Sequence, residues 1–70
     1  MQINSSNIRE ADYDRKSRLL RMTFINRPRW EYTYYNVPPT IWTRFLQASS
    51  KGGYFSDFIR DVFRYSRIIK

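Results

Sequence analysis

The strongest pattern in the chain is an alternation of aromatic and polar residues near its midpoint. In the stretch Trp30–Pro39, which reads WEYTYYNVPP, the residues Trp30, Tyr32 and Tyr34 share one parity. A period of two is typical of a half-buried strand. Because Pro38 cannot donate a hydrogen bond to a neighbouring strand, we expect this strand to end before it.

Two stretches before the midpoint show the same alternation. We expect strands at residues 8–13 and 18–25, joined to one another and to the third strand by polar turns at 14–17 and 26–29. Three consecutive strands with short connections form an antiparallel meander. Residues 1–7 are mostly polar, and we expect them to form an ordered but exposed lead-in.

After the prolines, the hydrophobic period changes to that of helices. A first apolar stripe runs over residues 41–49, in a helix that begins at Thr40 or at the proline pair. The pair Gly52-Gly53 is expected to end or follow this helix. A second stripe contains Phe55, Phe58, Ile59 and Val62, and residues 65–70 form either a short strand or coil. The predicted fold class is α+β, a three-stranded antiparallel meander followed by two helices packed on one face (β-β-β-α-α).

The parity of the strand residues indicates which face of the sheet the helices cover. If the aromatic row of the third strand were exposed, it would be a stacking platform for unpaired bases. We favour a place in the core, because large aromatic side chains dominate small cores. The open face would then be mixed in charge, with Glu10, Asp12, Arg21, Thr23, Glu31, Thr33 and Tyr35. The expected core is Tyr13, Leu20, Met22, Phe24, Tyr32, Tyr34, Trp42, Phe45, Phe55, Phe58 and Ile59.

Composition narrows the classes of function. The 70 residues, taken as a single domain over 1–70, contain no cysteine and no histidine, so a disulfide, a thiolate zinc site and a histidine base are excluded. Asp57 and Asp61 lie four residues apart, but the neighbouring arginines favour surface ion pairs over a metal site. We expect no catalytic residue, no metal and no cofactor. No apolar run is long enough to span a membrane, and we expect a cytoplasmic protein.

Charge is the strongest compositional signal. The net charge is +7, and residues 15–29 contribute six basic side chains and no acid. Such an excess is typical of a protein with an anionic partner, nucleic acid first and a membrane surface or acidic protein second, although a merely solvated surface gives the same count. Because the two turns of a meander lie at opposite ends, the charge falls at two poles. We expect Arg64, Arg67 and Lys70 near the first turn, beside Arg15 and Lys16.

The sequence Ser50-Lys51-Gly52-Gly53 is the short motif with most chemical interest. It leads into a helix N-terminus, where free backbone N–H groups and the helix dipole favour an anion. A plain helix–helix turn with Gly52 in the left-handed conformation is the more common use of such a motif, and the two are compatible. The expected phosphate-contacting residues are Arg27, Arg29, Trp30, Ser50, Lys51, Gly52, Gly53, Arg60 and Arg64.

Nearly the whole chain resembles one known family through an ordered series of motifs. They are Ser6-Asn7, Tyr13-Asp14, Leu20-x-Met22-x-Phe24, Tyr32-x-Tyr34, Asn36-Val37-Pro38, Ser50-Lys51-Gly52-x-Tyr54-Phe55 and Ile59-Arg60. This order resembles the KTSC family, named for the C-terminus of some lysyl-tRNA synthetases and found also as small stand-alone bacterial and phage proteins. The resemblance implies a small domain for which RNA binding has been suggested.

Two functions from different classes remain open at this point. The first is a monomeric, non-catalytic nucleic-acid-binding module, RNA before DNA, whose basic poles contact phosphates and which needs no membrane. The second is a protein–protein adaptor, for example a phage-type protein that docks on a host factor. The adaptor is suggested by the enrichment in arginine and tyrosine, which is also typical of protein interfaces. Its anchors would be Leu19, Ile25 and Tyr35 on the open face of the sheet.

Overall fold

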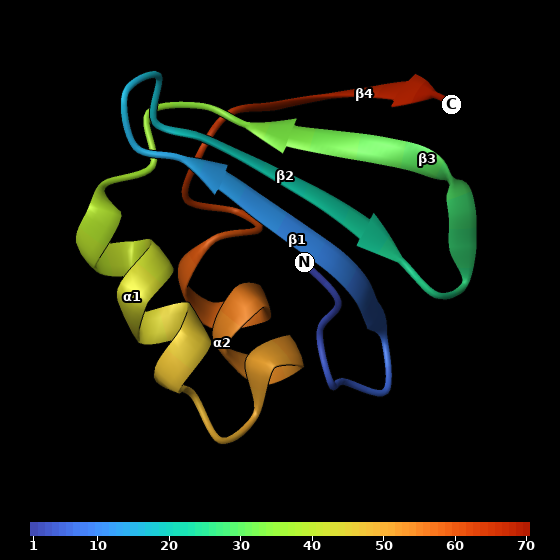
Figure 1. The fold of residues 1–70 in the computed structure, drawn as a ribbon, viewed down its shortest axis with the longest axis horizontal. Helices are drawn as coiled ribbons and strands as arrows, with labels where there is room; N and C mark the ends of the chain where they lie inside the picture. Colours follow the sequence, from blue (N-terminus) through green and yellow to red (C-terminus); the bar gives the residue numbers. More distant parts are fainter.

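A computed structural model describes all residues, 1–70, and shows an antiparallel sheet with two helices on one of its faces (Figure 1). The strands are β1 (Ile8–Asp14), β2 (Leu19–Phe24), β3 (Arg27–Tyr34) and β4 (Tyr65–Ile69), in the spatial order β1-β2-β3-β4. The α+β class and the meander are therefore confirmed. The three-stranded meander is incomplete: the C-terminal residues, left open between a short strand and coil, form β4 and add it to the free edge of β3.

The helices α1 (Pro39–Gln47) and α2 (Lys51–Phe58) connect β3 to β4 and lie together beneath the sheet (Figure 1). Pro39 occupies the first position of α1, where its missing N–H leaves no intrahelical hydrogen bond unmade. Trp42 and Phe45 are the buried residues of α1, and Phe55 is that of α2. The helices thus pack the aromatic face of the sheet, which leaves its other face open.

The buried residues confirm that Tyr32 and Tyr34 belong to the core and not to an exposed platform. Both are less than a tenth exposed, and the ring of Tyr34 meets that of Phe55 edge to face at 5.6 Å. Tyr13 stacks on Trp42 at 5.5 Å. The buried apolar residues are Ile3, Ile8, Ala11, Leu20, Met22, Tyr32, Tyr34, Val37, Trp42, Phe45, Phe55 and Ile59, with Tyr13 and Phe24 half-buried against them.

Phe58 and Val62 do not lie in the core, although the second helical stripe predicted it. Helix α2 ends at Phe58, and the chain turns so that Ile59 enters the core instead. The ring of Phe58 is half exposed and lies on Tyr54 at 4.7 Å, while Val62 is exposed in the following turn. The stripe therefore predicted the burial of Phe55 and Ile59 correctly and that of Phe58 and Val62 incorrectly.

The N-terminal residues are more closely packed than an exposed lead-in. The Ile3 N–H donates to the Arg9 carbonyl at 3.0 Å, and the Ala11 N–H donates to the Met1 carbonyl at 3.0 Å. The side chain of Ile3 is 7% exposed, and the terminal amine pairs with Asp12 at 2.8 Å. This segment therefore covers the outer edge of β1.

The second turn is shorter than predicted, because β3 begins at Arg27 and takes in Pro28. The register between β2 and β3 shifts between Met22 and Phe24, so that Arg27 faces Phe24 and Tyr32 faces Met22. Such a bulge accommodates a proline, which has no N–H to give to the neighbouring strand. Thr23, which was expected on the open face, is buried, and its hydroxyl accepts a hydrogen bond from Lys70 Nζ at 3.5 Å.

Strand β4 also corrects the placement of the C-terminal charges. It runs antiparallel to β3, so the Lys70 N–H donates to the Arg29 carbonyl at 2.8 Å, at the end of the sheet opposite the first turn. Arg67 pairs with Tyr32 in register. Only Arg64 of the three expected cations lies toward the first turn, where its carbonyl accepts the N–H of Tyr35. Neither α1 nor α2 has the length and hydrophobicity that a membrane-spanning helix needs.

Candidate functional site

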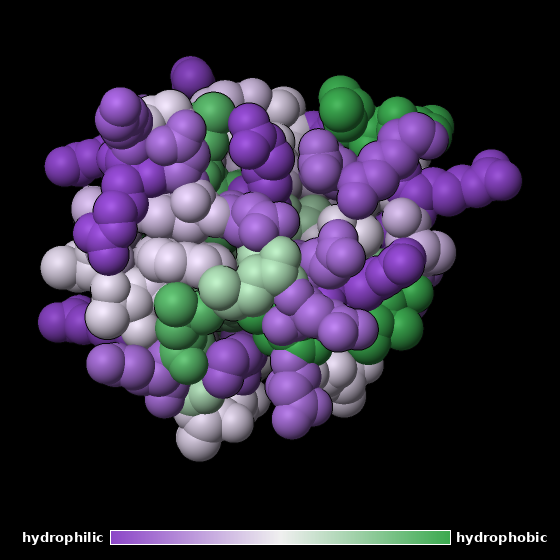
Figure 2. Space-filling view, viewed as in Figure 1, coloured by the Kyte–Doolittle hydropathy of each residue, from purple (hydrophilic) through white to green (hydrophobic).

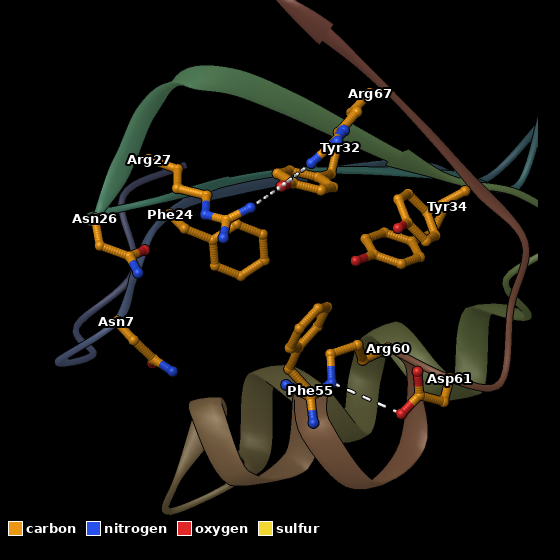
Figure 3. Close-up of a pocket in the computed structure, with 11 residues that line it drawn as sticks. Asn7, Phe24, Asn26, Arg27, Tyr32, Tyr34, Phe55, Arg60, Asp61 and Arg67 are labelled. Atoms are coloured by element: carbon orange, nitrogen blue, oxygen red, sulfur yellow. Dashed lines mark hydrogen bonds and ion pairs between the residues drawn. The ribbon is translucent and has the colours of Figure 1, made fainter.

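A pocket of about 430 Å³ lies between the covered face of the sheet and α2 (Figure 3). Its wall combines aromatic rings with guanidinium groups from β3, β4 and the turn after α2. The side chains that line it are Asn7, Phe24, Asn26, Arg27, Tyr32, Tyr34, Phe55, Arg60, Asp61, Tyr65 and Arg67. A volume of this size suits a small ligand or one group of a larger one.

The hydroxyl of Tyr32 lies between two arginines. Arg27 Nη1, from the same strand β3, and Arg67 Nη1, from the neighbouring strand β4, each donate to Tyr32 Oη over 3.4 Å (Figure 3). The hydrogen bond from Arg67, followed by that from Arg27, holds the pKa of Tyr32 below its ordinary value, against the opposing effect of burial. The same contact raises the pKa of Arg67. Two positive charges thus converge on one oxygen atom.

Neither of these arginines has an acidic partner. The ion pairs of the structure join the terminal amine to Asp12, Arg60 to Asp61 and Lys70 to Glu31. Arg67 lies instead over the ring of Trp30, 4.7 Å from its centroid, in a cation–π contact. A pair of guanidinium groups without carboxylates is electrostatically suited to an added anion.

Aromatic rings form the inner wall of the pocket. The ring of Phe24 lies 5.3 Å from that of Tyr32 and 5.2 Å from that of Phe55, which reaches up from α2 (Figure 3). Tyr65 of β4 lies 5.4 Å from Tyr34. Burial is the main reason that the pKa of Tyr34 lies well above its ordinary value, so this ring contributes a neutral hydroxyl.

The predicted phosphate-contacting residues are only partly brought together. Arg27 and Arg60 line the pocket, and Trp30 supports Arg67 from outside it. Arg29 is exposed next to them in β3. Arg64 lies outside the pocket, toward the other end of the sheet.

The motif Ser50–Gly53 adjoins the pocket but its donors are mostly used within the turn. Ser50 is the N-cap of α2, where its hydroxyl accepts from the Gly53 N–H at 3.1 Å. Lys51 Nζ donates to the Ala48 carbonyl at 3.2 Å. No glycine has a positive φ, so the expected left-handed Gly52 is wrong. A Cβ on Gly52 would lie 2.5 Å from Oδ1 of Asn7, so a larger residue there would require the Asn7 side chain to move.

Asn7 therefore connects this turn to the pocket, because it lies against Gly52 on one side and lines the pocket on the other. The helix N-terminus itself is capped by its own serine, which makes it a weaker anion site than the arginine pair.

The sequence interpretation missed Arg67 and Tyr65 as parts of this site. The sequence carries no clear signal for them, since apolar and polar residues do not alternate in Tyr65-Ser66-Arg67-Ile68-Ile69. As a strand beside β3, this segment places Tyr65 and Arg67 on the covered face with Tyr34 and Tyr32. The expectation that Arg67 lies near the first turn, beside Arg15 and Lys16, kept it apart from this site.

Comparison with known proteins identifies the family. The family model described as KTSC domain matches residues 4–63 of the chain. The crystal structure of a KTSC domain protein from Yersinia pestis has a TM-score of 0.90 and 31% sequence identity, over 97% of this chain and 93% of that chain. A search of the curated proteins finds no match. The chain belongs to the KTSC domain family.

Proposed function

We propose that this KTSC domain is a non-catalytic nucleic-acid-binding module that contacts phosphates at the Arg27 end of its sheet. The observation that carries the proposal is the pair Arg27 and Arg67, both without carboxylate partners, which meet at the hydroxyl of Tyr32 over an aromatic pocket. Arginine forks match phosphate oxygens, and aromatic rings accept unpaired bases. Single-stranded nucleic acid offers both groups together.

The surroundings of the pocket support an anionic partner. Arg29 and Lys70 lie at the same end of the sheet, joined by a backbone hydrogen bond of 2.8 Å. Arg60 adds a charge from the turn after α2, held only loosely by Asp61 at 3.8 Å with both side chains exposed. Glu31 is the other acid nearby, and it pairs with Lys70. Cations therefore outnumber carboxylates at this end.

RNA is favoured over DNA by two considerations. Protein recognition of RNA is mostly directed at single-stranded loops and ends, whose bases are free to leave the stack and enter a recess. The family resemblance adds the association with lysyl-tRNA synthetases. A duplex, by contrast, presents its phosphates on a rigid outer surface that does not reach the aromatic wall.

The test is the binding of a fluorescent single-stranded RNA, followed by anisotropy over a range of salt concentrations. The double variant Arg27→Glu/Arg29→Glu is expected to bind more weakly, with a flatter dependence of log K on log salt, because fewer counterions are released. The matched control is Arg9→Glu/Arg44→Glu, which makes the same change in net charge at two exposed positions outside the pocket. Equal losses in both variants would show diffuse attraction and contradict the proposed site.

One observation favours the second candidate, a protein–protein adaptor. Strand β4 has a free edge, all five of its residues are exposed, and Ile68 and Ile69 are 60% and 63% exposed. Figure 2 shows a hydrophobic area at the upper right, over the end of β4 seen in Figure 1. A partner strand would pair with such an edge.

The adaptor anchors expected from the sequence contribute unevenly to such an interface. Ile25 is half exposed, but Tyr35 is partly covered and its hydroxyl is hydrogen-bonded to Ser66. A pull-down from lysate that survives nuclease and high salt, and that Ile68→Lys abolishes, would support the adaptor. Recovery of nucleic acid alone would count against it.

A further inference from the structure

The two arginines of the pocket are held in a way that leaves them free to bind something else. Each of their hydrogen bonds to Tyr32 Oη is 3.4 Å long, at the weak end of the range for an N–H donor. A guanidinium carries several N–H donors, and these are the only side-chain hydrogen bonds that Arg27 and Arg67 make. A phosphate between them would accept shorter, charge-assisted hydrogen bonds.

The wall beneath the arginines is suited to a flat ring. Phe24 contacts both Tyr32 and Phe55, and Tyr34 and Tyr65 continue the surface toward β4. Phe24 and Tyr65 are the more exposed rings of this wall. Asn7 and Asn26 line the same pocket with amide groups that both donate and accept hydrogen bonds. Stacking surface, edge-binding amides and paired cations are the groups that hold a base and its phosphate.

We infer that this pocket takes one nucleoside monophosphate, with the phosphate on Arg27 and Arg67 and the base against the aromatic wall. The inference rests on the proposed function and names the part of a nucleic acid that enters the site. The ligand chemistry is a base that carries a phosphate monoester, whether as a free nucleotide or as the 5′-phosphorylated end of a strand.

A terminal phosphate fits better than an internal one for reasons of charge and access. A monoester carries a charge close to −2 at neutral pH, while an internal phosphodiester carries −1. The two unpaired guanidinium groups match the larger charge. An internal nucleotide would also need room for the strand on both sides of the pocket, whereas a terminal nucleotide needs it on one side only.

The first experiment is an amide chemical-shift titration of the whole chain with four probes: adenosine 5′-monophosphate, adenosine, inorganic phosphate and N-acetylphenylalanine. We expect the nucleotide to shift the amides of Phe24, Arg27, Tyr32, Phe55 and Arg67, and to bind at least about tenfold more tightly than either of its parts. Equal binding of inorganic phosphate would overturn the role of the aromatic wall. Tighter binding of N-acetylphenylalanine would overturn it in favour of a peptide carboxylate.

Variants identify the groups that hold the phosphate. Arg27→Gln and Arg67→Gln are each expected to weaken nucleotide binding about tenfold or more, because each removes charge-assisted hydrogen bonds. Arg44→Gln is the control, since it removes one charge from α1, which does not line the pocket. Thermal unfolding of each variant checks that it is folded. A loss in Arg44→Gln equal to that in the pocket variants would overturn the inference.

A comparison of strands separates the two sources of the ligand. A tetranucleotide with a 5′-phosphate is expected to bind the pocket, and the same strand with a 5′-hydroxyl is expected to lose the shifts at Arg27 and Arg67. If the two strands bind alike, the terminal phosphate is not recognised and the inference fails. If all the small probes fail while long RNA still binds through Arg27, the inference fails and the proposed function survives. If long RNA does not bind either, both the inference and the proposed function are contradicted.

Discussion

Single hydroxyl groups hold the ends of the strands in place. The Tyr13 hydroxyl donates to the carbonyl of Val37, a residue with no exposed surface, and so joins β1 to the segment that precedes α1. The Tyr35 hydroxyl makes a similar contact with Ser66, but at an exposed position. The two tyrosines therefore offer a matched comparison of one hydrogen bond in two environments.

The change Tyr13→Phe is expected to lower the free energy of unfolding by about 1 kcal/mol, because it leaves a partly buried carbonyl without its donor. Tyr35→Phe should lower it by less than about 0.5 kcal/mol, since water replaces the exposed partner. Urea denaturation of both variants measures the difference. A larger loss for Tyr35→Phe would show that the contact with Val37 is not the stabilising one.

Tyr34 gives the protein a predictable response to alkali. Burial raises its pKa in the folded state above the ordinary value of 10.0. Its phenol therefore contributes stability that is fully present below about pH 10 and is lost as the pH rises further, because the unfolded chain ionises first. Tyr32 has the opposite shift and partly offsets this loss.

We expect Tyr34→Phe to lose less stability than the unmodified chain between about pH 9 and pH 11, since phenylalanine does not ionise in either state. Urea unfolding at several pH values measures this slope. Identical slopes for the two proteins would show that Tyr34 ionises as readily in the folded state as in the unfolded chain.

At the scale of elements, the turn from β1 to β2 contains a strained residue. Arg18 has a φ of 58°, in the left-handed region that side chains with a Cβ rarely adopt. Its N–H donates to the Asp14 carbonyl at 2.8 Å, and its own carbonyl accepts the Val37 N–H, so the turn fixes this conformation. Asn36 has the same φ, but asparagine tolerates it.

The change Arg18→Gly should therefore raise the free energy of unfolding by about 0.5–1 kcal/mol, because glycine adopts a positive φ without steric cost. Arg15→Gly is the control, because it removes the same charge from the same turn at a residue without a positive φ. Urea denaturation is expected to show a gain for Arg18→Gly and none for Arg15→Gly. A loss in both would mean that flexibility outweighs the relief of strain.

The sequence predicted some elements more accurately than others, and the differences follow from the residue pattern of each element. The strands containing Leu20 and Tyr32 have an unbroken period of two, which one covered face enforces. The sequence predicted too long a second helix, because Phe58 and Val62 continue the apolar period. Only the packing of Ile59 in the core shows where α2 ends. Strand β4 is exposed on every residue, so burial gave its sequence no clear pattern.

At the scale of the whole molecule, the site depends on elements that are distant in the sequence. Sequence analysis selected Arg27 as part of a basic turn and Arg60 as part of a helix. The pocket that they share with Arg67 depends on β4, which runs back along β3. Arg67 was therefore assigned to the wrong end of the sheet. Charge counts located the basic segments, while strand order decided which arginines face one another.

The same geometry explains why the net charge of +7 is not the useful quantity. Arg44 and Arg9 add to that charge but lie outside the pocket. Arg27 and Arg67 converge on one hydroxyl without a carboxylate to neutralise them. Specific binding should depend on Arg27 and Arg67, whereas diffuse attraction should depend on the total net charge.

The most direct test of the central claim is an amide chemical-shift titration with a short 5′-phosphorylated single-stranded RNA, on the unmodified chain and on Arg27→Gln/Arg67→Gln. We predict shifts that cluster at Phe24–Tyr32, Phe55 and Arg67 in the unmodified chain, weaken steeply with salt and disappear in the double variant. Shifts of the same size and position in the double variant would contradict the claim that these two arginines hold the phosphate.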